Sequence, residues 1–269
     1  MKKIFFIICF LLPLGFLSVF ANAASPGGSY FPDKWEISGQ VGTSKMLFEL
    51  RGLTSRLPKE FKHKPGYTFG LSLSRTVRLH WKPSFSMYFY HFSGDNDNPV
   101  FSAIGKNADF DDFVRAPVEY KTDMWAVMLG TRYYLWEFTR PEYKKLSLNP
   151  YLELQVGLNF LSTVLGYKDP PAGRAGLIFE KGKGDPMRPA TVIGQYSFGG
   201  GTEINLHHSW KLSVGWNFDF IDYNCVDAVH NYYSSGEEIY TMDVVSRLMV
   251  GIIIPVRKKK PGYKIWAPR

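Results

Sequence analysis

Residues Trp210 to Phe220, WKLSVGWNFDF, decide the fold of this chain. Apolar side chains at 210, 212, 214, 216, 218 and 220 share one parity, and the smaller or polar residues between them share the other. Because successive side chains of a strand point to opposite faces, the stretch predicts a strand with one apolar and one polar face. A tilted strand needs about 9–11 residues to cross the hydrocarbon of a bilayer, whereas ordinary strands usually run about 5–6. The stretch is therefore long enough to be a transmembrane strand.

The N-terminus predicts export. Residues 1–23 open with Lys2 and Lys3, continue through an apolar run and end in the small residues of Ala-Asn-Ala. This order is typical of a secretory signal peptide that is cleaved after Ala23. A retained anchor is the alternative, but Pro13 interrupts the run. The rest of the chain has no apolar run long enough for a membrane helix, so a spanning structure would have to be a closed barrel.

The same alternation recurs along the chain. The segment at 84–93 is the least regular, because it carries aromatic residues on both parities. An even number of segments predicts an all-β fold, an eight-stranded antiparallel up-and-down transmembrane β-barrel with its apolar face outward. The eight segments are 35–47, 66–79, 84–93, 122–135, 151–165, 191–206, 210–223 and 240–256.

The connections give a second, independent signal. Those after the odd-numbered segments are long, and those around 80–83 and 207–209 are short, with 136–150 as an intermediate exception. Short periplasmic turns that alternate with long outer loops are typical of outer-membrane barrels. The four long connections are 48–65, 94–121, 166–190 and 224–239.

In pattern and topology the chain resembles the outer-membrane β-barrel family, and in plan the small eight-stranded OmpA-like and OmpX-like barrels of Gram-negative envelopes. The resemblance implies an outer-membrane location, with a signal peptide over 1–23, a periplasmic leader over 24–34, the barrel over 35–256 and a basic periplasmic tail over 257–269. Such barrels commonly finish on an aromatic residue at the chain end, whereas here RKKKPGYKIWAPR follows the last segment.

The side chains on the polar parity of each segment would point into the barrel, which predicts a polar lumen. An eight-stranded barrel is just wide enough inside to be filled by side chains. Carboxylates and guanidinium groups confined there should pair through charge-assisted hydrogen bonds. We expect a packed polar core that closes the barrel, with a gated ion path as the alternative. The inward charged residues are Glu36, Arg78, Arg132, Glu153, Glu203 and Arg247.

His91 and Ser93 are the catalytic candidates. Two residues apart on a strand, they share one face and lie near several acidic residues. The pair is similar to that of lipid A deacylase barrels, in which an activated serine attacks an acyl ester. It departs from that family because Gly94 replaces the asparagine that should follow, and because the pair lies on an early strand. We therefore expect a rim histidine, a turn serine and no enzymatic activity.

No cofactor or metal site is predicted. The run DNDN at 95–98 has the oxygen ligands that calcium prefers, but it lacks the later glycine and glutamate of a calcium loop. His207 and His208 are adjacent and so point to opposite faces of a strand. Cys225 is the single cysteine after residue 23, which predicts an unpaired loop thiol.

Charge and tryptophan placement indicate the partners. The formal net charge is +8, but its cations are scattered and only 257–260 is a dense run, so nucleic acid is not expected as a partner. We expect contacts with outer-membrane lipid and lipopolysaccharide, and leave open a ligand of the outer loops or a periplasmic partner of the basic tail. A soluble lipocalin-like barrel, with its apolar face inside, is a further alternative. The apolar face carries Trp35, Trp125, Trp210 and Trp216, which favours membrane girdles.

Overall fold

The computed structural model of the chain describes residues 35–51, 55–56, 61–77, 81–97, 116–135, 148–170, 172, 176–181, 191–206, 210–222, 226 and 242–256. Eight of its strands are long and two are short. No helix in this part of the chain is long and apolar enough to cross a membrane. The strands are β1 (Trp35–Arg51), β2 (Ser55–Arg56), β3 (Lys62–Arg75), β4 (Trp81–Asn96), β5 (Val118–Tyr134), β6 (Leu148–Tyr167), β7 (Leu177–Lys181), β8 (Thr191–Asn205), β9 (Lys211–Ile221) and β10 (Met242–Val256).

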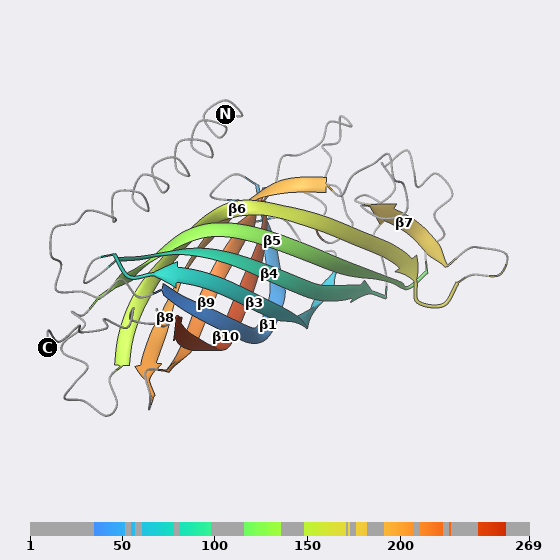
Figure 1. Cartoon of the computed structure of the whole chain (residues 1–269). Helices are drawn as coiled ribbons and strands as arrows, with labels where there is room; N and C mark the ends of the chain where they lie inside the picture. The colour runs from blue at the N-terminus through green and yellow to red at the C-terminus, as the bar shows by residue number, and fades with distance from the viewer. Residues whose placement is uncertain are drawn as a thin grey trace, which may run out of the picture.

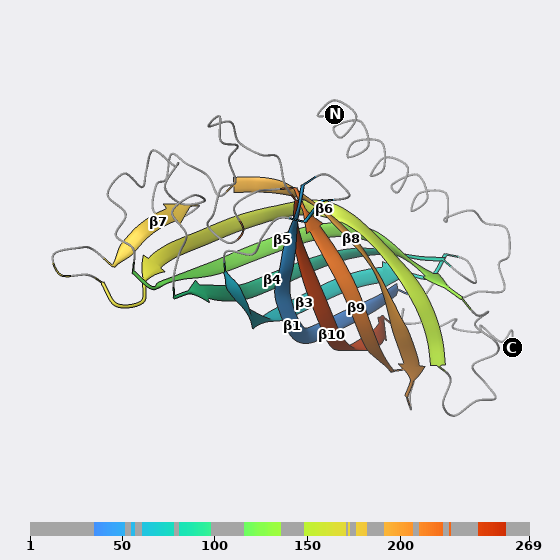
Figure 2. The same cartoon turned by 180° about the vertical axis from the view of Figure 1, so that it is seen from behind.

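The eight long strands close into an antiparallel barrel. Each pairs with the next long strand along the chain, in the order β1, β3, β4, β5, β6, β8, β9, β10. The first and last strands then pair with each other, from Trp35 opposite Val256 to Leu50 opposite Met242 (Figures 1 and 2). The predicted up-and-down barrel is confirmed. The short strands β2 and β7, which pair with β1 and β6, were not predicted.

Several strands are longer than the alternation of the sequence predicts. β3 begins at Lys62 and not at residue 66, and β5 begins at Val118 and not at residue 122. In β3 and β5 the extra residues lie at the ends that the long connections join, and Figure 1 shows β4, β5 and β6 reaching out on that side, where β7 also lies. The ladder continues there, as Asn96 opposite Val118 and Val118 opposite Tyr167 show. Beyond the apolar belt the outward side chains of a strand need not be apolar. The sequence there stops alternating, although the backbone hydrogen bonds between neighbouring strands continue.

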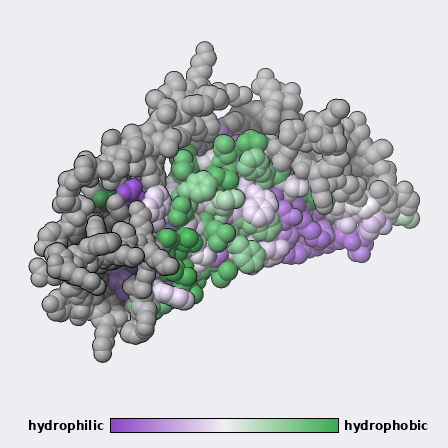
Figure 3. Space-filling view, in the orientation of Figure 1, coloured by the Kyte–Doolittle hydropathy of each residue, from purple (hydrophilic) through white to green (hydrophobic). Residues whose placement is uncertain are grey.

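A belt of apolar side chains covers the outside of the barrel. Leu71 is 64% exposed, and Leu154 and Trp216 are each 56% exposed. Figure 3 shows the hydrophobic residues gathered in a band across the strands, with hydrophilic residues beyond it. The indole nitrogen of Trp216 donates to Ser246 Oγ at 2.8 Å, so this polar group has a partner even on the apolar face. A continuous exposed apolar surface of this kind marks an interaction with lipid or with another protein.

The inside of the barrel is filled by large side chains that lie against glycines. On β4, Tyr88, Tyr90 and Phe92 point inward and are buried, which explains why this strand carries aromatic residues on both parities. Tyr88 lies against Gly70: a Cβ on that glycine would come within 2.7 Å of its ring. The absence of glycine side chains thus creates the room that the tyrosines occupy.

Candidate functional site

Glu203 on β8 is the centre of a polar cluster in the half of the lumen nearest Trp35 of β1 and Val256 of β10. Its Oε1 accepts hydrogen bonds from Lys82 Nζ at 2.9 Å, Arg132 Nη1 at 3.0 Å and Tyr134 Oη at 2.6 Å. Its Oε2 lies 3.4 Å from Lys211 Nζ. Glu203 has no exposed surface. One carboxylate therefore joins β4, β5 and β9 to β8 across the inside of the barrel.

Two further carboxylates complete this cluster. Glu36 on β1 binds Lys82 and accepts from Lys211 Nζ at 2.8 Å. Glu153 on β6 accepts from Arg132 Nε at 2.7 Å. All but Lys211, which is largely buried, have at most a few per cent of their side chains exposed. Charges removed from water in this way cost several kcal/mol each unless they are paired, and here each has a partner of opposite sign.

A second cluster surrounds Arg247 of β10 near the middle of the lumen. Arg247 Nε lies 3.1 Å from Asp219 Oδ2, and its guanidinium carbon is 3.9 Å from the centre of the Tyr88 ring. Tyr90 Oη donates to the same carboxylate at 3.0 Å. Stacking on tyrosine and pairing with aspartate both suit a desolvated guanidinium group.

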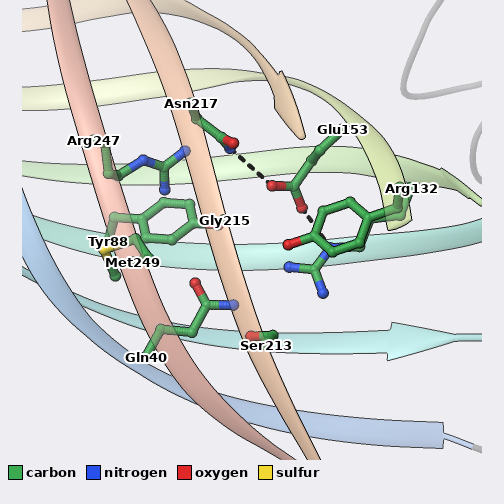
Figure 4. A pocket seen from close by; sticks show the side chains of 10 residues that line it. Gln40, Tyr88, Arg132, Glu153, Ser213, Gly215, Asn217, Arg247 and Met249 are labelled. Atoms are coloured by element: carbon green, nitrogen blue, oxygen red, sulfur yellow. Dashed lines mark hydrogen bonds and ion pairs between the residues drawn. The ribbon is translucent and has the colours of Figure 1, made fainter. Parts of the chain in front are cut away.

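A small cavity lies between the two clusters. Figure 4 shows Arg132 and Glu153 on one side of it and Arg247 and Tyr88 on the other, with Asn217 donating to Glu153 Oε2 at 2.8 Å. The cavity holds about 10 Å³, which is room for one water molecule at most. The lumen at this level is filled by side chains.

The charges of the two clusters balance. Four cationic side chains face four carboxylates, so the lumen offers neither a cation nor an anion a net attraction at this level. A row of charges of one sign, which channels use to select ions, is not formed by these eight residues. They are Lys82, Arg132, Lys211 and Arg247, with Glu36, Glu153, Glu203 and Asp219.

Val226, from the connection between β9 and β10, is buried inside the other end of the barrel. Its carbonyl oxygen accepts from Thr122 Oγ1 at 2.5 Å and from Thr163 Oγ1 at 3.4 Å, and its amide donates to Asp243 Oδ2 at 3.0 Å. Val226 has no exposed surface and belongs to an apolar cluster with Leu165. Backbone hydrogen bonds and apolar packing thus hold Val226 inside the barrel.

The structure brings five of the six predicted lumen residues together. Glu36, Arg132, Glu153, Glu203 and Arg247 all point inward and are buried, whereas Arg78 lies outside the described residues. Of the other three charged members of the clusters, the sequence placed Lys211 and Asp219 on the polar parity of their segment without including them in the charged network, and it placed Lys82 in the short connection around 80–83, which is wrong because β4 begins at Trp81. The parity of their strands was the signal that could have found them, and in the structure Lys82 lies opposite Arg132.

The two rim candidates lie on the outward face of β4. His91 Nδ1 is 2.7 Å from Asp123 Oδ1 of β5, and the imidazole stacks on the ring of Tyr67 of β3 at 4.8 Å between ring centres. Ser93 was expected in a turn, but this is wrong, because β4 continues to Asn96. The cross-strand neighbours of Ser93 are lysines at 64 and 121, and their ladder bonds extend the strand past the point where the apolar pattern ends.

The acidic run at 95–97 binds lysines. Asp95 Oδ2 lies 2.8 Å from Lys64 Nζ and 2.9 Å from Lys168 Nζ, and Asp97 Oδ1 lies 2.6 Å from Lys168 Nζ. Hydrogen bonds from Lys64 and Lys168 lower the pKa of Asp95 to about 2. Among the described residues, no three His, Cys, Asp or Glu side chains are grouped to hold a metal ion. Residues 98, 207, 208 and 225 lie outside the described residues.

The chain is similar in fold to several solved outer-membrane barrels. Neisserial surface protein A matches with a TM-score of 0.42 and 10% identity over 82% of this chain and 96% of its own. OprG of Pseudomonas aeruginosa matches with a TM-score of 0.43 and 10% identity over 84% and 97%. Ail, the attachment invasion locus protein of Yersinia pestis, matches with a TM-score of 0.36 and 8% identity over 81% and 98%. No family model and no curated protein matches the sequence.

Proposed function

We propose that this protein is an outer-membrane barrel with a sealed lumen, which anchors and displays its outer strands and loops and does not serve as a pore. The observation that carries the proposal is the reversed polarity of the barrel: exposed apolar side chains outside, paired charges inside. A signal peptide over 1–23, a leader over 24–34 and a basic tail over 257–269 remain part of the same prediction.

The exposed belt supports the membrane location. Trp125 is 54% exposed and Trp81 is 47% exposed, and both lie on the outward face with the aliphatic residues. A soluble lipocalin-like barrel would bury these side chains around an internal ligand cavity, whereas here the interior holds Glu203 and Arg247. The chain ends and short connections would face the periplasm, and the extended strands β4, β5 and β6 the outside.

The polar clusters and Val226 support a sealed lumen. The two clusters fill the inner half and the middle of the lumen with balanced charges, and Val226 is buried in its outer half. The extended outer strands would then provide the surface that contacts lipopolysaccharide. Together with the long connections, they would also bind any further ligand. This distribution favours a binding or structural role.

Heat-modifiable migration and conductance together test the proposal. Protein from the outer-membrane fraction should migrate faster unboiled than boiled, and should give no single-channel steps in planar bilayers. Soluble protein with a single mobility would overturn the membrane location. Reproducible channels from the heat-modifiable form would overturn the sealed lumen.

A further inference from the structure

Asn159 of β6 carries a carboxamide that is buried in an apolar part of the lumen. It has no exposed surface, and its direct cross-strand neighbours are Ala126 of β5 and Ile193 of β8. Both neighbours belong, with Leu161 of β6, to the cluster of buried hydrophobic residues inside the barrel. Within the described part of the chain, neither Oδ1 nor Nδ2 of Asn159 has a hydrogen-bond partner. Burying an amide without partners is costly, so these two atoms indicate a ligand.

Gln195 of β8 offers a third polar atom of this kind. It also has no exposed surface, and its Oε1 has no hydrogen-bond partner among the described residues. Gln195 lies opposite Gly157, two residues before Asn159 on β6, so the two carboxamides are diagonal neighbours on the inward face. Diagonal neighbours of this kind stand about 7–8 Å apart along the backbone. The ends of both side chains can therefore approach one small molecule.

The orientation of the Gln195 amide follows from its other neighbour. Tyr90 Oη donates its only hydrogen to Asp219 Oδ2 at 3.0 Å. The same oxygen can therefore only accept from Gln195, whose Nε2 lies 3.3 Å away. Exchanging the two ends of the amide would place its carbonyl oxygen against an acceptor. Gln195 thus turns Nε2 towards Tyr90, and Oε1 is the end that is left for a ligand.

We propose that one water molecule is bound inside the barrel between Asn159 and Gln195. The ligand must accept a hydrogen bond from Asn159 Nδ2 and donate one to Gln195 Oε1. A metal ion or an ammonium group cannot accept a hydrogen bond and a simple anion cannot donate one, whereas water does both. A water molecule with two hydrogen bonds of ordinary length separates its partner atoms by about 5 Å, which suits the side chains of diagonal neighbours. Ala126, opposite Asn159, presents only a methyl group to it.

This water would extend the Arg247 cluster outward to β6. Arg247 binds Asp219, Asp219 accepts from Tyr90, and Tyr90 accepts from Gln195. With the water, the chain of hydrogen bonds continues to Asn159 and connects five strands, β10, β9, β4, β8 and β6. The inference rests on the sealed lumen proposed above, because a water molecule in an open lumen would exchange freely with solvent.

NMR of the folded, ¹⁵N-labelled full-length protein in detergent micelles tests this water. A long-lived bound water gives the side-chain amide of Asn159 NOE and ROE cross-peaks of opposite sign, whereas hydrogen exchange with solvent gives the same sign in both. The amide signals are identified by their loss in Asn159→Leu. Gln195→Met removes the acceptor and should abolish the cross-peaks at Asn159. Gln40→Met is the matched control, because Gln40 is also a buried lumen glutamine but its Nε2 donates to Ser38 Oγ at 3.2 Å.

Heat-modifiable migration shows whether each variant is folded, and the wild-type spectrum decides the matter even if Gln195→Met fails to fold. Cross-peaks of opposite sign that persist in Gln40→Met and are lost in Gln195→Met would establish the site. Their absence from the folded wild type would overturn the bound water and leave the sealed lumen standing. Cross-peaks that survive unchanged in folded Gln195→Met would refute the bridge between the two amides. Rapid exchange of the Asn159 amide with solvent would show an open lumen and so contradict both proposals.

Discussion

Glu203 is a single residue whose carboxylate connects four strands across the inside of the barrel. Four donors on three other strands meet one carboxylate that has no contact with solvent. Such an ion pair contributes little net stability relative to an apolar core, because desolvation offsets much of the attraction. Removing one charge is different, since its partners then stay buried without compensation. The network therefore fixes which side chains fill the lumen more than it raises the stability of the fold.

Replacing Glu203 by Gln should destabilise the barrel by about 3–5 kcal/mol, the usual loss when one partner of a buried ion pair is removed. Lys82, Arg132 and Lys211 would then share only the charge of Glu36 and Glu153. Urea unfolding in lipid vesicles measures the loss. Glu119→Gln is the control, because Glu119 pairs with Lys121 on the outward face, where 37% of its side chain is exposed. Equal losses in the two variants would contradict the network.

Asp95 gives a prediction for acid pH. Its pKa lies at about 2, below the ordinary 3.8, because Lys64 and Lys168 donate hydrogen bonds to the carboxylate. This pairing stabilises the folded state above pH 4, and its contribution should be lost as pH falls from 4 towards 2. In Lys64→Met and Lys168→Met variants the pKa of Asp95 should rise towards 3.8, which carboxyl NMR titration measures. An unchanged pKa in both variants would refute these contacts.

At the scale of the element, β8 is defined by its three consecutive glycines at 199–201. Gly201 lies where β8, β9 and the ring of Tyr151 come together: a Cβ there would be 2.2 Å from the Val214 carbonyl oxygen and 2.7 Å from Tyr151 Oη. Glycines inside a strand often mark a bend or a close approach of backbones, and the structure shows the close approach. Glycine weakens a strand in general, but here it lets a neighbouring strand and a lumen tyrosine fit.

Gly201→Ala should therefore destabilise the barrel by about 1–3 kcal/mol, the usual cost of overpacking. Gly39→Ala is the matched substitution, since a Cβ at Gly39 meets nothing within 4 Å and should leave stability unchanged. Urea unfolding in vesicles compares the two. A Gly201→Ala variant as stable as Gly39→Ala would show that β8 and its neighbours can move apart freely.

The whole molecule has the polarity expected of a body surrounded by hydrocarbon. In the described part of the chain, a belt of exposed apolar side chains surrounds the barrel, and eight charged side chains pair inside it. A water-surrounded protein gains by the opposite distribution, because burying apolar surface is the dominant favourable term in its folding. In lipid, the closed ladder between β1 and β10 leaves no edge of the barrel with unpaired backbone groups.

Leu154→Arg tests this distribution. Leu154 lies midway between the exposed Leu148 and Phe160 of β6 and is 56% exposed, so arginine there should cost about 2–4 kcal/mol in a bilayer and slow folding into vesicles. Asp169→Arg, on an exposed residue beyond the end of β6, should fold like the wild type. If Leu154→Arg folds normally into vesicles, or is more soluble and fully folded without lipid, the apolar belt does not contact hydrocarbon.

The sequence by itself determined the barrel, because alternation with a period of two is a local property that each strand carries in full. WKLSVGWNFDF became β9 at Lys211–Ile221, and Glu36, Arg132, Glu153, Glu203 and Arg247 followed from parity. Only the tertiary structure decided which charges meet, since Lys82 and Glu203 lie 121 residues apart and their pairing depends on strand register and tilt. It likewise decided the outer extensions and the contact between His91 and Asp123, because a polar strand end held by ladder hydrogen bonds leaves no periodic signal in the sequence.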